Sequence, residues 1–150
     1  MRLAPGFVSG VLLALTACSE GPFGGEATVP EVIDNIHRWD GKIYHVEGWL
    51  GNCGDLDCAI YSTKADALLV GRASVSADYD DEWFAAMDRR LSIASMEGFD
   101  EQAEPFQFQQ VVVVALISDY CRGWGRGCTD RAPDLIPFSI EPVGSQLKEE

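Results

Sequence analysis

The chain has 150 residues, of which 47% are hydrophobic and 10% aromatic, and 24 acidic against 11 basic residues give a formal net charge of −13. This length matches one domain with an ordinary core, because a chain of this size buries roughly two thirds of its unfolded surface. The acidic balance excludes a basic nucleic-acid-binding protein, so no nucleic-acid partner is expected.

The first 17 residues predict an export signal. Arg2 supplies a positive start, and the apolar run from Phe7 to Leu15 is shorter than the ~20 residues of a membrane-spanning helix. The next residues, Leu15-Thr16-Ala17-Cys18, resemble the lipobox of bacterial lipoprotein precursors. That resemblance implies cleavage before Cys18, a diacylglycerol on its sulfur and an acyl chain on its amine. Two or more chains anchor a protein stably to a membrane.

The residue after Cys18 indicates which membrane would hold the lipidated protein. Ser19 stands where the inner-membrane retention signal of this family has Asp, which implies the outer membrane, with the domain facing the periplasm. The alternative is a plain secreted protein in which Cys18 is incidental. Residues 18–29 are rich in Gly and lack periodicity, and this composition predicts a flexible tether.

The folded domain is expected at residues 30–142, beginning with a helix. Pro30 suits the first position of a helix, and apolar residues recur at helical spacing up to Arg38. Trp39-Asp40-Gly41 ends the helix. Lys42 to Leu50 then alternates, with Tyr44, Val46 and Leu50 on one face and His45 and Glu47 on the other, as in a half-buried strand.

The middle of the chain offers two short strand candidates, Ala59–Tyr61 and Ala67–Val70, of which only one need pair with the first strand. Asp80-Asp81-Glu82 predicts the acidic start of a helix with an apolar stripe at Trp83, Phe84 and Met87. Leu91–Ile93 is the next short strand candidate. Residues 98–104 then predict a loop or a helical turn before Pro105.

Two strands are expected in the last third. Val111–Ile117 is apolar and mostly β-branched, which predicts a central buried strand. Leu135–Glu141 alternates, and Pro137 places this strand at an edge or a bulge. Residues 143–150 form a polar tail.

Four cysteines remain besides Cys18. An even number in an exported chain favours disulfides, and sequence alone does not choose among the three possible pairings. The two close pairs, Cys53 with Cys58 and Cys121 with Cys128, lie in Gly-rich loops that can bend back, so these pairings are favoured. A four-cysteine zinc site is the competing hypothesis, but the second pair encloses more residues than zinc ligand pairs usually do.

A helix followed by five strands, with Asp40-Gly41-Lys42 entering the first strand and Gly48 inside it, resembles the small oligonucleotide/oligosaccharide-binding (OB) barrels of bacterial envelope proteins. The resemblance covers about residues 30 to 142 and implies that Gly48 lets the first strand bend around the barrel. It also implies that the two cysteine loops join the first strand to the second and the fourth to the fifth, flanking the ligand groove. One further helix before the third strand departs from the family pattern.

The candidate binding residues are Arg122, Trp124 and Arg126, which converge between two cysteines. Arginine recognises carboxylate or phosphate, and tryptophan offers a flat apolar surface. The competing interpretation is a disulfide-closed loop that only connects two strands and whose arginines aid solubility. His37 and His45 lack a metal-binding motif, Asp55 and Asp57 form only a fragment of a calcium loop, and no catalytic motif is present.

We therefore expect a non-enzymatic, membrane-anchored envelope lipoprotein, without cofactor or metal, that binds a protein or a cell-wall component. One alternative is a structural or assembly subunit of an envelope complex with no ligand of its own. A weaker alternative is a hydrolase acting on envelope material.

Overall fold

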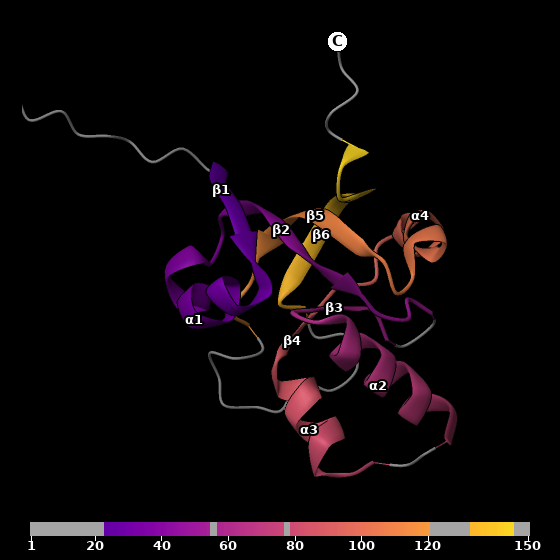
Figure 1. Cartoon of the computed structure of the whole chain (residues 1–150). Coiled ribbons are helices and arrows are strands. Elements are labelled where there is room, and N and C mark those ends of the chain that lie inside the picture. Colours follow the sequence, from indigo (N-terminus) through magenta and orange to yellow (C-terminus); the bar gives the residue numbers. More distant parts are fainter. Residues whose placement is uncertain (1–22, 55–56, 77–78, 121–132, 146–150) are drawn as a thin grey trace, which may run out of the picture.

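A computed structural model of the chain describes residues 23–54, 57–76, 79–120 and 133–145, and these residues form a mixed α/β domain (Figure 1). In chain order, the elements are β1 (Phe23–Thr28), α1 (Val29–Trp39), β2 (Ile43–Leu50), β3 (Ala59–Tyr61), α2 (Lys64–Ser76), α3 (Asp81–Asp88), β4 (Arg90–Ser92), α4 (Phe99–Ala103), the 3-10 helix η1 (Glu104–Phe106), β5 (Gln110–Ile117) and β6 (Leu135–Pro142).

The strands form one sheet with the order β4-β3-β2-β5-β6, and β1 adds to β2 in parallel. All the other pairs of neighbouring strands are antiparallel. The two ends of this order also meet, because Ile93 and Leu135 form a parallel bridge. At this junction the Ala94 N–H donates to the Leu135 carbonyl at 2.8 Å, and the Asp134 N–H donates to the Ser92 carbonyl at 3.1 Å. The sheet therefore turns back on itself at this bridge.

The main core lies inside this curved sheet. Val29, Val32 and Ile36 of α1 are buried there together with side chains from the strands and from α4. A second buried cluster lies on the other side of β3, where Ala67 and Val70 of α2 and Ala86 of α3 pack against Tyr61. The helices α2 and α3 thus cover the outer side of β3, and Figure 1 shows them on the opposite side of the molecule from β1.

The expected flexible tether is wrong for residues 23–28, which form β1. The register pairs Glu26 with His45 and Thr28 with Glu47. Sheet pairing uses backbone groups, so a Gly-rich segment without apolar periodicity can still add a strand. A side chain at Gly24 would overlap the ring of Tyr44, so glycine permits the close approach of β1 to β2.

The Ala67–Val70 strand candidate is also wrong, because these residues lie in α2. The Thr63 hydroxyl accepts a hydrogen bond from the Asp66 N–H at 3.1 Å, which satisfies one of the free donors at the helix start. Ala67, Val70 and Ala73 are buried, and this spacing of three residues is helical. The other candidate, Ala59–Tyr61, is the strand that pairs with β2. Two helices rather than one therefore precede β4.

Several local signals in the sequence proved correct. Gly41 has a φ of +75°, which favours glycine, and the Lys42 N–H donates to the Trp39 carbonyl at 2.9 Å where α1 ends. The Asp80 carboxylate accepts from the Trp83 N–H at 2.8 Å and caps α3. The register of β5 and β6 shifts opposite Pro137, as the proline predicted.

The pairing of Cys53 with Cys58 is confirmed as a disulfide in the connection between β2 and β3. Both cysteines are buried in the main core. The expected partnership of Cys121 and Cys128 lies outside the described residues.

We expect the double substitution Cys53→Ala and Cys58→Ala to lower the free energy of unfolding by about 2 kcal/mol, because it releases a short closed loop in the unfolded chain. Urea denaturation followed by tryptophan fluorescence measures the change. Asn52→Ala, at an exposed residue of the same loop, is the control and should shift the free energy by less than about 0.5 kcal/mol. A double variant as stable as the wild type would contradict the assigned role.

Candidate functional site

One side of the sheet carries the side chains of β1, β2, β5 and β6 that point away from the core, and we call this surface the outer face. Along β2, Tyr44, Val46 and Leu50 are buried, whereas the residues that alternate with them are partly or fully exposed. The register aligns the outer-face residues in three rows, namely Phe23, Ile43, Leu116 and Ile136, then Glu26, His45, Val114 and Ser139, then Thr28, Glu47, Val112 and Glu141.

Part of the outer face is apolar, and we call this part the apolar band: Phe23, Ile43, Val114, Leu116, Ile136 and Phe138. Phe23 is 71% exposed and Phe138 is 57% exposed. The other four side chains are half-buried and belong to neither buried cluster. Apolar side chains that gather on an exposed surface mark sites of interaction, so the apolar band is a candidate contact surface.

An open groove of about 380 Å³ lies on the same strands, and we call it the acidic groove. Its lining residues are Glu26, Ala27, Thr28, Glu31, His45, Glu47, Val112, Glu141, Pro142, Val143 and Gly144. Four of them are glutamates and none is lysine or arginine. A concave surface of one sign concentrates the opposite charge, so the groove favours cationic groups.

Neighbouring groups hold three of the four glutamates. The Thr28 N–H and hydroxyl donate to Glu31 Oε2 at 2.8 and 2.7 Å, respectively. The backbone hydrogen bond, helped by the side-chain one, lowers the pKa of Glu31 below its usual value. Glu47 Oε1 accepts from Gln110 Nε2 at 2.6 Å, and Glu141 Oε2 accepts from the Ser145 hydroxyl at 3.3 Å. These hydrogen bonds orient three of the four carboxylates in the groove.

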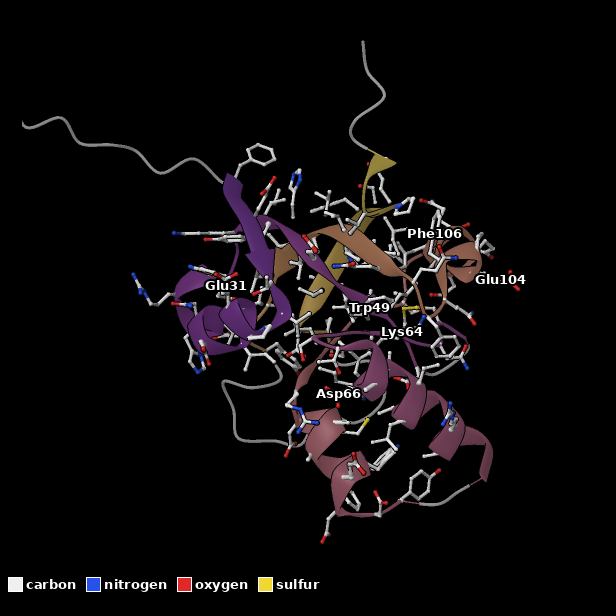
Figure 2. The ribbon with its side chains drawn as sticks, viewed as in Figure 1. Glu31, Trp49, Lys64, Asp66, Glu104 and Phe106 are labelled. Atoms are coloured by element: carbon white, nitrogen blue, oxygen red, sulfur yellow. A yellow bond between two sulfur atoms is a disulfide. The ribbon has the colours of Figure 1, made fainter. Side chains whose placement is uncertain are left out.

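Towards β3, the same side of the sheet is covered. Trp49 alternates with the buried residues of β2, as His45 and Glu47 do, and it pairs with Tyr61. Tyr61 of β3 is 2% exposed beneath α2 and α3, and this burial raises the pKa of Tyr61 to about 12. Figure 2 shows Lys64, at the start of α2, beside Trp49 of β2, and Lys64 Nζ lies 5.2 Å from the centre of the tryptophan ring. The helices α2 and α3 therefore close the β3 part of the outer side to a ligand, and the outer face on β1, β2, β5 and β6 remains exposed.

The disulfide loop is tied to the sheet by an ion pair. Arg90 Nη1 lies 2.6 Å from Asp57 Oδ1, and the Arg90 side chain is only 13% exposed. The pairing gives Asp57 a structural partner in β4. Asp55 lies outside the described residues.

The structure describes only some of the site residues that were predicted from the sequence. Arg122, Trp124 and Arg126, together with Cys18, Cys121 and Cys128, lie outside the described residues. His37 Nδ1 lies 3.1 Å from Asp119 Oδ2, whereas His45 lines the acidic groove. Within the described part of the chain, no group of three or more His, Cys, Asp or Glu residues is arranged to hold a metal ion.

The outer face as a site was not predicted from the sequence. The alternation of Lys42 to Leu50 did place His45 and Glu47 together on the face opposite Tyr44. The strand β1, which brings Glu26 and Phe23 to that face, was not predicted. An alternating acidic and apolar pattern is absent from residues 23–28, so only the pairing with β2 reveals their role.

Comparison of the chain with protein-family models, with curated proteins and with solved structures finds no match. None of the helices in the described ranges is long and apolar enough to cross a membrane.

Proposed function

We propose that this chain is a lipid-anchored protein of the bacterial envelope, facing the periplasm, that serves as a non-enzymatic binding module for a protein or a cell-wall component. The sequence Leu15-Thr16-Ala17-Cys18 after a short apolar run supports lipidation at Cys18. Ser19 supports placement at the outer membrane. The net charge of −13 argues against an anionic polymer as the ligand.

We further propose that β2 to β6 form an OB-like barrel. The bridge between Ile93 and Leu135 supports this proposal, because it joins the two ends of the five-strand path from β4 to β6. The Cys53–Cys58 loop connects β2 to β3, which are the first and second strands of such a barrel. OB-folds bind ligands on the face of their second and third strands. Here α2 and α3 pack over that side of β3, so a ligand must use another surface.

The observation that carries the binding function is the combination of the acidic groove and the apolar band on one exposed face. Charged groups at a rim improve specificity and the rate of encounter, and apolar side chains supply the buried contact area. A partner with cationic groups next to apolar ones fits both parts. The apolar band also favours the second candidate, a structural subunit whose outer face is buried in a larger assembly.

In-cell photo-crosslinking tests the proposal. We expect a photoreactive amino acid at Val112, which lines the acidic groove, to give a discrete crosslinked product from the full-length protein. The same group at Glu101, an exposed residue of α4, is the control. Sensitivity of the product to a muramidase identifies a cell-wall ligand, and sensitivity to a protease alone identifies a protein. Equal labelling from both positions, or none from Val112, would refute binding at this face.

Charge variants measure the contribution of the groove. The triple substitution Glu26→Gln, Glu47→Gln and Glu141→Gln should reduce the crosslinked yield about tenfold, since exposed ion pairs contribute about 0.2–1 kcal/mol each. Asp34→Asn, Glu97→Gln and Glu101→Gln change the net charge equally at exposed residues outside the groove. A similar loss in both variants would mean that the overall charge, not the groove, attracts the partner.

A further inference from the structure

The proposed lipid at Cys18 lies close in sequence to the start of the described domain. Five peptide units separate Cys18 from Phe23, the first residue of β1. Whatever conformation these residues adopt, they span at most about 18 Å. The inference drawn here rests on the proposed function, because it requires that the lipid is present. Under that condition, the Phe23 end of β1 cannot move far from the membrane surface.

The first outer-face row begins at this same end. Strand register aligns Phe23 with Ile43, Ile43 with Leu116, and Leu116 with Ile136. Since neighbouring strands lie about 4.8 Å apart, four strands carry this row across roughly 14 Å. Phe23 is 71% exposed, and the other three side chains are half-buried outside both buried clusters. Among the described residues, an apolar row therefore begins at the residue of the domain that follows Cys18 most closely in sequence.

We propose that the row of Phe23, Ile43, Leu116 and Ile136 rests on the lipid bilayer, so that the domain docks against the membrane that anchors it. The occupant is the bilayer because the proposed lipid on Cys18 lies within reach of this row. A short tether holds the row at an effective concentration in the millimolar range, so a contact too weak to bind membranes alone is sufficient. Aromatic side chains such as Phe23 are suited to insertion at the boundary between headgroups and acyl chains.

The charges on the domain define which membrane surface is favoured. Glu26 lies in the row next to Phe23, and the chain as a whole is acidic. The apolar contact therefore drives docking, and negatively charged lipid opposes it. The third row, with Glu47 and Val112, begins four residues further along β2, about 13 Å from the first row. Docking in this orientation leaves the acidic groove open to a partner.

Quenching by brominated phosphatidylcholine tests the contact in the full-length lipidated protein, reconstituted in vesicles of that lipid. We expect Phe23→Trp to add emission that the bromine quenches by at least half, relative to the wild-type protein. Phe84→Trp is the matched control, because Phe84 is an exposed phenylalanine, 56% accessible, on α3 at the opposite side of the molecule. Absence of added quenching at Phe23→Trp, or equal quenching in both variants, would overturn the proposal.

Two further measurements separate the possible failures. Flotation of the protein with the vesicles in high salt, with a lipid mass on the peptide that begins at Cys18, reports the anchor alone. A protein that fails to float contradicts the proposed lipidation, whereas a protein that floats without quenching contradicts only the docking. Replacing part of the phosphatidylcholine with phosphatidylglycerol should weaken quenching at low salt. Stronger quenching with that anionic lipid would overturn docking through the apolar row.

Discussion

Gly48→Ala is expected to lower the free energy of unfolding by about 3 kcal/mol, the upper end of the usual cost of overpacking a core. A Cβ at Gly48 would lie 2.7 Å from the Tyr61 carbonyl oxygen, 2.7 Å from Ile60 Cγ1 and 2.8 Å from Val29 Cγ2. A methyl group cannot be accommodated by turning a flexible side chain, because one of these neighbours is backbone. Urea denaturation of the full mature chain, followed by tryptophan fluorescence, measures the loss.

Gly54→Ala is the matched control for Gly48→Ala. A Cβ there would meet only Asn52 Oδ1, at 3.8 Å, so the change should stay within about 0.5 kcal/mol. The comparison isolates the close approach of β2, β3 and α1 at Gly48 from the general effect of losing a glycine. A Gly48→Ala protein that unfolds at the wild-type urea concentration would show that these three elements are less tightly packed than described.

Asp134→Ala is the second substitution with a large expected effect, because it opens the junction between β4 and β6. The Asp134 side chain is buried, and its Oδ2 accepts hydrogen bonds from the Ser92 N–H at 3.0 Å and the Ser92 hydroxyl at 3.2 Å. Hydrogen bonds to a charged group contribute about 1.5–3 kcal/mol each, so the loss should reach about 3 kcal/mol. Hydrogen exchange at the Ala94 amide, which donates to the Leu135 carbonyl, should accelerate as well.

Asp134→Asn separates the hydrogen bond from the charge. The amide oxygen can still accept from Ser92, so this variant should lose clearly less stability than Asp134→Ala. The Ala94 amide should also exchange more slowly in Asp134→Asn than in Asp134→Ala. Equal losses in the two variants would indicate that the negative charge itself, rather than the acceptor, holds the junction. An unchanged exchange rate at Ala94 in Asp134→Ala would mean that the bridge between Ile93 and Leu135 is maintained by other contacts.

The elements that the sequence predicted correctly are those with a complete local signal. The α1 helix has apolar spacing and a glycine stop, α3 has an acidic cap at Asp80, and β5 is a continuous β-branched run. β1 has no such signal, since its hydrogen bonds are made by backbone groups with a strand that lies later in the chain. The sequence of α2 does contain its capping residue, Thr63, and the residues that α2 buries, Ala67 and Val70. The short apolar run at these residues was, however, equally consistent with a strand.

The candidate site depended even more on distant contacts. The placement of two groove residues, His45 and Glu47, on a common face followed from the alternation along β2. The placement of Glu26 and Glu141 depended on the strand register, which sets Glu26 beside His45 and Glu141 beside Val112. Register between strands far apart in sequence is decided by the packing of the whole core, and a single strand does not encode it. The binding residues predicted from the sequence were instead Arg122, Trp124 and Arg126, because charged and aromatic residues lie close together there in the chain.

The absence of any connecting residue between β1 and α1 has a mechanical consequence. Thr28 ends β1 and also supplies the hydrogen bonds to Glu31 in the first turn of α1, whose Val29, Val32 and Ile36 lie in the core. Tension applied through the N-terminal end of β1 acts along the strand and loads its pairing with β2 in shear, rather than opening the hydrogen bonds one after another. Because the strand continues directly into a helix buried in the core, the load is passed to the centre of the domain. A pull on the first residue of β1 is therefore expected to load the core through α1.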